Sequence, residues 1–359
     1  MMQQDIQSEG CHILAIETSC DETSVSIVKD GKIVLSNLVS SQIETHKAFG
    51  GVVPEVASRK HVESITLMIE EAIQESGVAL QDISAIAVTQ GPGLVGALLV
   101  GIMAAKSLAF ALDKPLIGTH HIAGHIYANN LTAEIKYPSM ALVVSGGHTE
   151  LVLLESEGQF QLIGSTRDDA VGEAYDKVAR ALGFPYPGGP YVDNLAMEAE
   201  SAVSLPRVWL EADSYDFSLS GLKSAVLNVV NQKKMRGEEP MIGEIARGFQ
   251  ESVVEVLVEK AVRAVRQYGA KQLLLCGGVA VNRGLRANLT ERCEKEQIEL
   301  LIPPFEYCTD NAAMIGAAAY LKWKHGQFTT LDMKAEPSFS LEKWSVTYQP
   351  VEQTENSID

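Results

Sequence analysis

The segment Lys114-Pro115-Leu116-Ile117-Gly118-Thr119-His120-His121-Ile122-Ala123-Gly124-His125 joins a short apolar run to three of the chain's eight histidines. The apolar run predicts a short strand that ends in glycine. His121 and His125 are four residues apart, so on a helix they share one face, and two imidazoles at that spacing suit one metal ion. The segment predicts an α/β fold with a ligand site at a strand end, where open α/β sheets bind ligands. The alternative is that the histidines are ordinary polar residues at a helix start.

A third candidate metal ligand, Asp310, lies far along the chain. It stands in Cys308-Thr309-Asp310-Asn311, directly before an apolar run that predicts the last helix, to about residue 324. A carboxylate is a common third ligand beside two imidazoles. A metal site of His121, His125 and Asp310 is therefore the first hypothesis.

Composition limits the classes of protein that need to be considered. The 359 residues suffice for one large or two medium domains, and 46% hydrophobic with 21% charged residues is ordinary for a globular protein. The net charge of −17 argues against non-specific nucleic-acid binding over most of the surface, although it allows a local basic patch. Five scattered cysteines without a CxxC pair predict reduced thiols in the cytosol.

We expect a cytoplasmic protein without membrane association. The opening residues Met1-Met2-Gln3-Gln4-Asp5 are polar and acidic, unlike a signal peptide. The apolar run 94–112 is interrupted by glycines, Lys106 and Ser107, so it predicts a buried helix rather than a membrane span.

The two halves of the chain follow one plan. Each begins with three strands joined by tight turns, predicted at 13–16, 24–28 and 32–39 and again at 140–144, 150–154 and 160–164. Helices and strands then alternate. In the first half, Ser58 is predicted to cap a helix that Gly77 ends, followed by strand 83–89 and helix 94–112. In the second half, helices are predicted at 170–182, 242–268 and 283–297, and strands at 272–276 and 298–302.

This repetition predicts a duplicated α/β fold of two lobes with a central cleft, the plan of the actin-like ATPase and sugar-kinase (ASKHA) superfamily. The N-terminal lobe is placed at 11–135 and the C-terminal lobe at 136–335, with an insertion at about 185–240. Residues 1–10 and 340–359 are expected to be flexible tails.

Glycine-rich turns carry the next signals. Ser145-Gly146-Gly147-His148 lets the backbone approach a ligand closely, or it is a hairpin with a glycine bulge. Asn282, after Gly277-Gly278, either contacts an adenine or ribose or caps the following helix. Asp176, before Tyr186-Pro187-Gly188-Gly189-Pro190, either binds a ribose hydroxyl or is a first-turn carboxylate favoured by the helix dipole. No GxxxxGK[ST] motif is present, which excludes a P-loop.

Several motifs together resemble one family, the bacterial tRNA threonylcarbamoyladenosine transferases (TsaD), long described as O-sialoglycoprotein endopeptidases. They occur in family order from about residue 12 to 325, and their joint match is far more specific than any one of them. They are the segments 16–23 (IETSCDET), 50–55 (GGVVPE), 91–94 (GPGL), 144–148 (VSGGH), 172–177 (GEAYDK), 186–190 (YPGGP), 217–223 (FSLSGLK) and 308–311 (CTDN), with the pair His121 and His125. Some relatives carry an acid at Ala123, which is given no role.

The resemblance implies an activity and its machinery. The family transfers a threonylcarbamoyl group from L-threonylcarbamoyl-adenylate to the N6 amine of the adenosine 3′ of the anticodon in tRNAs that read ANN codons, releasing AMP. It implies one Fe²⁺ or Zn²⁺ per subunit at His121, His125 and Asp310. The implied adenylate contacts are Val144, Ser145, Gly146, Gly147, His148, Asp176, Gly189, Asp193 and Asn282. Asp21 or Glu22 can accept the proton that the attacking amine loses.

The implied partners are tRNA, a paralogous subunit of the same fold (TsaB-like) and a small P-loop ATPase (TsaE-like). The apolar helices 59–76 and 94–112 are the expected partner face, and the densest basic run, Lys233-Lys234-Met235-Arg236, is either a tRNA contact or a solvated loop. Three rival classes of protein fit the sequence less well. A zincin protease lacks its general base, because Ile122 follows His121 where HExxH has Glu. A small-molecule kinase would not explain three metal ligands, and an actin-like scaffold would need neither metal nor paired glycine turns.

Overall fold

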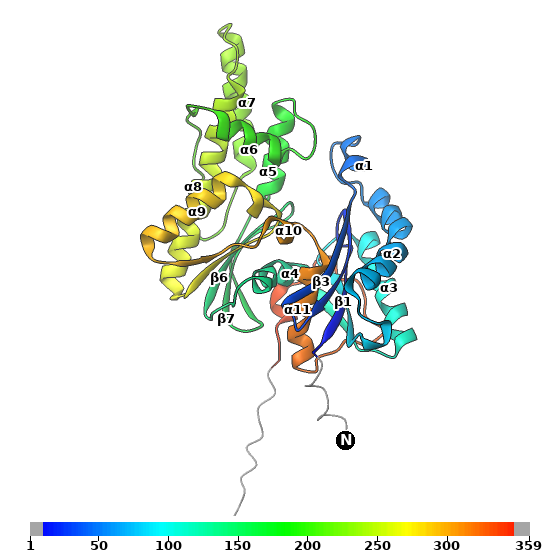
Figure 1. The fold of residues 1–359 in the computed structure, drawn as a ribbon. Helices are drawn as coiled ribbons and strands as arrows, with labels where there is room; N and C mark the ends of the chain where they lie inside the picture. Colours follow the sequence, from blue (N-terminus) through cyan, green and yellow to red (C-terminus); the bar gives the residue numbers. More distant parts are fainter. Residues whose placement is uncertain (1–9, 348–359) are drawn as a thin grey trace, which may run out of the picture.

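The computed structural model describes residues 10–347 and contains two five-stranded sheets (Figure 1). The first has the order β3-β2-β1-β4-β5, and the second has the order β10-β9-β6-β7-β8. In each sheet three consecutive strands pair antiparallel, and two later strands add in parallel beside the first of them. This duplicated plan confirms the predicted two-lobe α/β fold.

The strands have the following bounds. In the first sheet they are β1 (His12–Glu17), β2 (Glu22–Lys29), β3 (Ile33–Ser41), β4 (Ala85–Gly91) and β5 (Leu116–His120). In the second they are β6 (Ser139–Val144), β7 (Thr149–Ser156), β8 (Gln159–Ser165), β9 (Gln272–Cys276) and β10 (Glu299–Leu301).

The first sheet is covered on both faces because consecutive apolar residues in β1 place apolar side chains on both sides. Leu14 and Ile16 of β1 face α2 (Pro54–Ser76) and α3 (Val95–Leu112). Ile13 and Ala15 face α11 (Ala312–Lys324) on the other side. The chain thus returns to the first sheet after completing the second.

Two helices form a central layer between the sheets. They are α11 and the short α4 (His121–Tyr127), which the figure places between the two lobes (Figure 1). Ile122 and Ile126 of α4 and Ala317 of α11 pack on the inner face of the second sheet. The elements that carry the predicted metal ligands therefore lie at the centre of the molecule.

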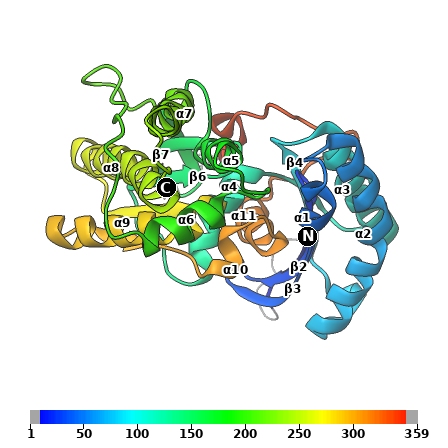
Figure 2. The same cartoon turned by 90° about the horizontal axis from the view of Figure 1, so that it is seen from above.

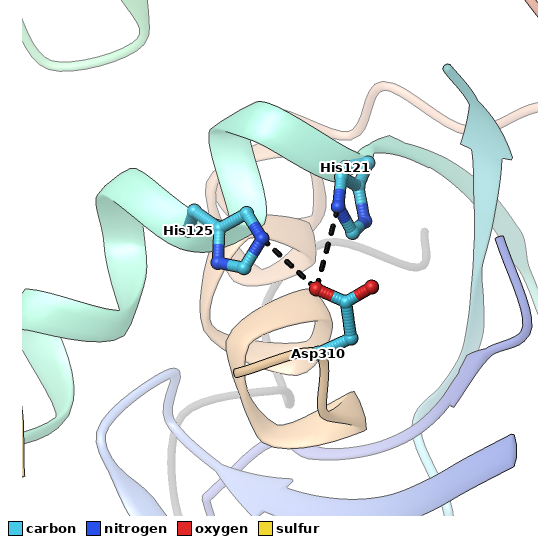
Figure 3. A group of neighbouring side chains, drawn as sticks. All are labelled: His121, His125 and Asp310. Atoms are coloured by element: carbon cyan, nitrogen blue, oxygen red, sulfur yellow. Dashed lines mark ion pairs between the residues drawn. The ribbon is translucent and has the colours of Figure 1, made fainter. Parts of the chain in front are cut away.

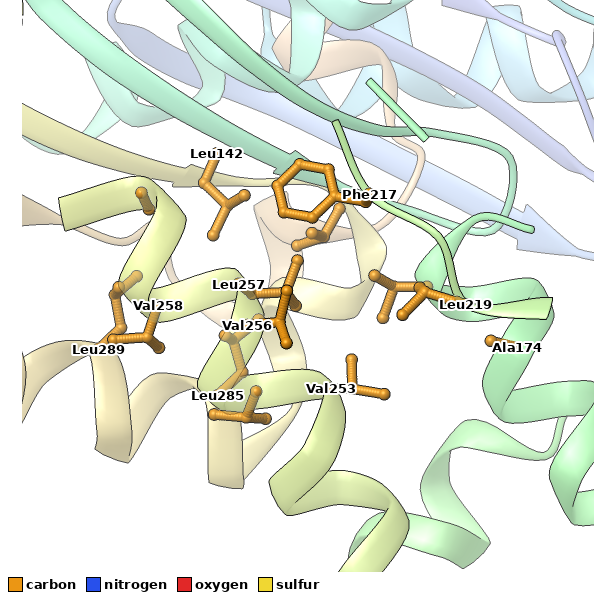
Figure 4. Close-up of a cluster of buried hydrophobic side chains, with 14 of the residues drawn as sticks. Leu142, Ala174, Phe217, Leu219, Val253, Val256, Leu257, Val258, Leu285 and Leu289 are labelled. Atoms are coloured by element: carbon orange, nitrogen blue, oxygen red, sulfur yellow. The ribbon is translucent and has the colours of Figure 1, made fainter. Parts of the chain in front are cut away.

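The outer face of the second sheet carries the largest core. Leu142 of β6 packs with Phe217, Leu257 of α8 (Ile242–Tyr268) and Leu285 of α9 (Arg283–Glu296) (Figure 4). Seen from above, α8 and α9 lie on the outer side of this lobe, opposite α2 and α3 of the other lobe (Figure 2). Helix α5 (Val171–Ala181) precedes the insertion, which contributes α6 (Gly189–Glu198) and α7 (Ser220–Met235), with α7 projecting from the lobe (Figure 1).

The short elements complete the chain. They are α1 (Ile43–Lys47), α10 (Phe305–Cys308) and the 3-10 turns η1 (Leu80–Asp82), η2 (Ala128–Leu131), η3 (Gly278–Val281) and η4 (Leu341–Trp344).

Two predicted helix features were wrong. Helix α2 begins at Pro54 with Val53 as its N-cap, not at Ser58, because proline at the first helical position is already set for the helix. Its predicted end is confirmed, since Gly77 adopts φ 68°. Helix α3 is not buried all round: Leu98 and Ile102 pack inward, whereas Met103 and Phe110 are exposed.

Among the described residues, α3 is the helix that is long and apolar enough to cross a membrane by length and composition. Here it packs beside α2 on one face of the first sheet. We therefore treat it as a helix of the fold.

The chain after α11 is ordered by side-chain contacts. Residues 341–344 form η4, and Trp344, within the expected flexible tail, is only 3% exposed. Its Nε1 donates a hydrogen bond of 2.9 Å to the carbonyl oxygen of Gly118 in β5. The expected tails at 1–9 and 348–359 lie outside the described residues.

Candidate metal centre and ligand site

Helix α4 places His121 and His125 on one face, one turn apart, directly after β5. His120 caps the helix: its backbone is extended, and its Nδ1 accepts a hydrogen bond from the N–H of Ile122. Gly124 allows α11 to pack closely, because a Cβ there would stand 2.8 Å from Cδ1 of Ile315. The sequence therefore fixes both the start of α4 and its distance from α11.

Asp310 faces the two histidines from the start of α11, whose N-cap is Asn311 (Figure 3). Its Oδ1 lies 3.1 Å from Nε2 of His125 and 3.6 Å from Nε2 of His121. Ligand atoms of the three residues all lie within 4.8 Å of one another. The structure thus brings together the three predicted metal ligands.

His125 indicates what this group lacks. It is completely buried, neither ring nitrogen has a hydrogen-bond partner, and the contact of Nε2 with Asp310 is an ion pair only. Buried polar atoms without partners are costly and rare. A cation between the rings and the carboxylate would satisfy Nε2, and two imidazoles with one carboxylate suit Fe²⁺ or Zn²⁺. The residues therefore fit a metal ion.

The charges around this group reinforce one another. Burial by itself would raise the pKa of Asp310, but His121 and His125 hold it well below its usual value. Burial by itself would lower the pKa of His121, but Asp310 and Glu17 outweigh it and raise the pKa to about 9. The site thus keeps Asp310 ionised and ready to bind a cation.

Asp21 and Glu22 lie beside this group, at the turn between β1 and β2. Asp21 is buried, and Glu22 accepts a hydrogen bond of 3.0 Å from the hydroxyl of Ser41. Burial, together with the charges of Asp310 and Asp21, raises the pKa of Glu22 well above its usual value. Glu22 therefore holds its proton more tightly than an ordinary glutamate.

The turn between β6 and β7 faces the same centre from the second lobe. The N–H of His148 donates to Oγ of Ser145, which closes the turn. Burial first, and then the charges of His121 and His125, lower the pKa of His148 to about 4, so this ring is neutral and close to the histidine pair. A Cβ at Gly146 or Gly147 would meet no atom within 4 Å. The glycines therefore border open space.

Asp176 organises the next loop. Its Oδ1 accepts a hydrogen bond of 2.6 Å from the N–H of Gly188, and burial raises its pKa although the N–H groups of Gly188 and Gly189 oppose that rise. Tyr186 belongs to the same loop. Burial raises its pKa, and the nearby charge of Asp21 adds to that rise. This loop of the second lobe therefore faces the β1–β2 turn of the first.

Asn282 caps α9, as one of its two interpretations predicted. Its Oδ1 accepts from the N–H of Leu285 at 2.7 Å, and its Nδ2 donates to Gln250 at 2.8 Å. Asp193 accepts a hydrogen bond of 2.8 Å from Arg283, while its buried Oδ1 has no partner. Both residues lie around one helix start, with Asp193 retaining an unused acceptor.

Glu17 belongs to one of the motifs found in the sequence, but no role was predicted for it. Glu17, at the end of β1, is completely buried and contacts Nδ1 of His121. The available signal was a carboxylate directly after the apolar run 13–16.

These features define a class: a two-lobed α/β protein of the ASKHA type, with a candidate metal centre between its sheets. Solved structures agree on the fold. The activator of 2-hydroxyisocaproyl-CoA dehydratase from Clostridium difficile is 16% identical with a TM-score of 0.52, covering 89% of this chain and 98% of that one. Full-length HypF is 16% identical with a TM-score of 0.60, covering 90% of this chain and 48% of that one.

Within this class, the chain belongs to the tRNA N6-adenosine threonylcarbamoyltransferase (TsaD) family, whose sequence model matches residues 33–317. A relative of that name from Halalkalibacterium halodurans is 60% identical, covering 94% of this chain and 98% of its own length. Another, from Bacillus cereus, is 59% identical, covering 95% and 100%. The predicted family and enzyme class, a tRNA-modifying acyltransferase, are thereby confirmed, and the kinase alternative is not favoured.

Proposed function

We propose that this chain transfers the threonylcarbamoyl group of L-threonylcarbamoyl-adenylate to the N6 amine of the adenosine 3′ of the anticodon. The observation that carries the proposal is the meeting of three groups from separate elements: the His121–His125–Asp310 cluster, the turn at 145–148, whose His148 lies within reach of the charges of the histidine pair, and the acid Glu22, which lies within reach of the charge of Asp310. An acyl transfer from an adenylate needs a site for the donor, stabilisation of the leaving phosphate and a proton acceptor.

The donor is placed by the second lobe. In the turn from Val144 to His148, the N–H groups of Gly146 and Gly147 lie beside open space, where they can stabilise charge on the leaving phosphate. Asp176, Gly189, Asp193 and Asn282 surround the proposed adenosine end. His121, His125 and Asp310 would hold a metal ion, Fe²⁺ or Zn²⁺ at one per chain, which would supply positive charge and Lewis acidity to the bound donor.

The reaction breaks one bond and forms another. The N6 amine attacks the carbamoyl carbon, a C–N bond forms, and the bond from that carbon to the phosphate oxygen breaks, so AMP leaves. The amine loses one proton, which we assign to Asp21 or Glu22, the two acids at the turn between β1 and β2.

The proposed partners follow from the exposed surface. Large apolar side chains stand exposed on the outer helices of the first lobe: Val62 and Leu67 on α2, and Val95, Leu99, Met103 and Phe110 on α3. An apolar face of this kind suits a partner subunit, and we propose that it takes a paralogue of the same fold. A small P-loop ATPase is the second proposed partner. The proposed compartment is the cytoplasm, where tRNA is available.

The test is a transfer assay with the purified chain, threonylcarbamoyl-adenylate and unmodified tRNA, with and without the paralogue. We expect the modified nucleoside and AMP in equal amounts by mass spectrometry, and loss of both in Asp310→Asn. Transfer of phosphate from ATP to a small molecule, without nucleoside modification, would refute the proposal.

A further inference from the structure

Glu17 stands behind the proposed metal centre and is held by hydrogen-bond donors. Its carboxylate is 0% exposed and contacts three polar groups, one in the turn after β1, one in β4 and one in α4. The N–H of Ser19 donates to Oε1, the hydroxyl of Thr89 in β4 donates to Oε2 at 2.6 Å, and Nδ1 of His121 lies 3.1 Å from the same Oε2. A buried carboxylate is costly unless it is paired and hydrogen-bonded, and these donors meet that requirement.

The two rings of the pair differ in their surroundings. Nδ1 of His121 contacts Glu17, while its Nε2 points toward Asp310 (Figure 3). Nδ1 of His125 is buried and has no partner. The imidazole of His121 is therefore oriented by a contact at Nδ1, and the imidazole of His125 is not.

The contact with Glu17 determines which nitrogen of His121 can bind a metal. An ionised carboxylate only accepts hydrogen bonds, so Nδ1 must carry a proton, and the lone pair is left on Nε2. Oγ of Ser19 also lies 3.1 Å from Nδ1, but a hydroxyl can donate or accept and does not select a tautomer.

We propose that Glu17 is a positioning residue, which fixes the Nδ1–H form of His121 and aims Nε2 at the position shared with His125 and Asp310. The inference rests on the metal site of the proposed function. Carboxylates that hold metal-binding histidines in this way are worth about 10–100-fold in metal affinity or activity.

The first test compares metal affinity among three variants by competition with a chelating indicator. Glu17→Gln keeps the shape, but its amide NH₂ must face either the N–H of Ser19 or Nδ1 of His121, so we expect Zn²⁺ affinity to fall about 10–100-fold. The control Thr89→Val removes another hydrogen bond from the same oxygen and leaves the histidine contact. Ser19→Ala removes the competing hydroxyl. Both control variants should lose less Zn²⁺ affinity than Glu17→Gln.

The same variants can be loaded with Co²⁺, whose visible ligand-field spectrum reports the geometry of the metal ligands and not the general stability of the fold. We expect the visible ligand-field spectrum to change in Glu17→Gln and to remain in Thr89→Val. Equal affinity and an unchanged spectrum in Glu17→Gln, or a larger loss in Ser19→Ala, would overturn the inference. A wild-type chain that binds no metal would instead refute the metal site itself.

A second measurement needs no substitution at Glu17, in case that variant does not fold. In the Zn²⁺-loaded, ¹⁵N-histidine-labelled protein, we expect Nε2 of His121 to bind the metal and its Nδ1–H proton to exchange more slowly than that of His125. Metal on Nδ1 of His121, or equally fast exchange at both rings, would contradict the role of Glu17.

Discussion

Nε2 of His120 lies 2.9 Å from the carbonyl oxygen of Phe339 and donates to it, because Nδ1 of the same ring already accepts from the N–H of Ile122. Burial lowers the pKa of His120 to about 3, so the ring stays neutral. The residue that caps the histidine helix is thus held by the segment that follows α11. This contact links the last part of the described chain to the centre of the molecule.

The first prediction concerns the anchor of that segment. Trp344 is buried, bonds Gly118 through Nε1 and lies 6.1 Å from the ring of Phe160, centroid to centroid. Trp344→Ala should lower the free energy of unfolding by about 3–5 kcal/mol in urea denaturation, as for other buried aromatic residues. Trp209→Ala, at a side chain that is 40% exposed, is the matched control and should cost much less. Equal losses would mean that the segment is only loosely attached.

The second prediction concerns the metal. His121→Ala with His125→Ala should remove the single transition-metal ion that we expect on each chain, because it deletes two of three proposed ligands. The measurement is elemental analysis of the purified proteins. His325→Ala, at an exposed histidine at the end of α11, should retain the metal. Unchanged metal content in the double variant would refute the site.

The third prediction concerns Glu150 of β7. Burial raises its pKa from 4.5 to about 7. Because the folded state holds the proton more tightly than the unfolded chain, the resulting stability is present below pH 4.5 and is lost as the pH rises to about 7. Glu150→Gln should therefore stabilise the protein by about 1–3 kcal/mol at pH 8, and by far less near pH 4.5.

The check on Glu150 is denaturation across that pH range. Glu155→Gln, at an exposed residue of the same strand, is the control and should change nothing. A wild-type protein as stable as Glu150→Gln at pH 8 would show that the Glu150 carboxylate is well solvated.

The fourth prediction concerns the glycine turn. A Cβ at Gly147 meets no atom within 4 Å, so the fold should tolerate Gly147→Val, while the added methyl groups would occupy the proposed ligand space. Calorimetry should show affinity for AMP reduced more than about tenfold, or 1.4 kcal/mol, with an unchanged melting temperature. The AMP affinity of Gly147→Ala should lie between those of the wild type and Gly147→Val. Wild-type affinity in the valine variant would leave the turn as a hairpin only.

The sequence predicted the fold well because its signals are local. Consecutive apolar residues such as Ile13 and Leu14 indicate a buried strand, and a glycine such as Gly77 indicates the end of a helix. Both signals involve only a few neighbouring residues. The start of α2 was missed because Ser58 has the side chain of a good cap, whereas the true start depends on Pro54. Local patterns do not rank two competing helix starts.

Long-range contacts explain what could not be predicted. Asp310 was a candidate ligand by residue type, but only the packing of α11 against α4 places it beside His125. Glu17 received no role because its partners, Thr89 and His121, are distant in the chain. The segment around Trp344 was predicted as a tail because its sequence is irregular. Its contact with Gly118, far away in the chain, could not be seen from the sequence.

The last prediction concerns tRNA. With a net charge of −17, most of this surface should repel a polyanion, and binding by counterion release needs several cations gathered on one face. The run Lys233–Arg236 lies at the exposed end of α7, where Lys233 lies 3.8 Å from Glu238, so part of its charge is already paired. We therefore expect the isolated chain to bind tRNA weakly, and the complex with the paralogous partner to bind it tightly across a shared surface.

The measurement is tRNA affinity against salt concentration, with and without that partner. A steep fall of log K with log salt should appear only in the complex, since the slope counts the phosphates that are neutralised. Charge reversal at the end of α7 then locates the contact. If α7 takes part, Lys233→Glu with Lys234→Glu should weaken binding, and Glu238→Lys with Glu239→Lys should strengthen it. Two unchanged affinities would remove α7 from the docking surface, and tight, salt-dependent binding by the isolated chain would refute the shared surface.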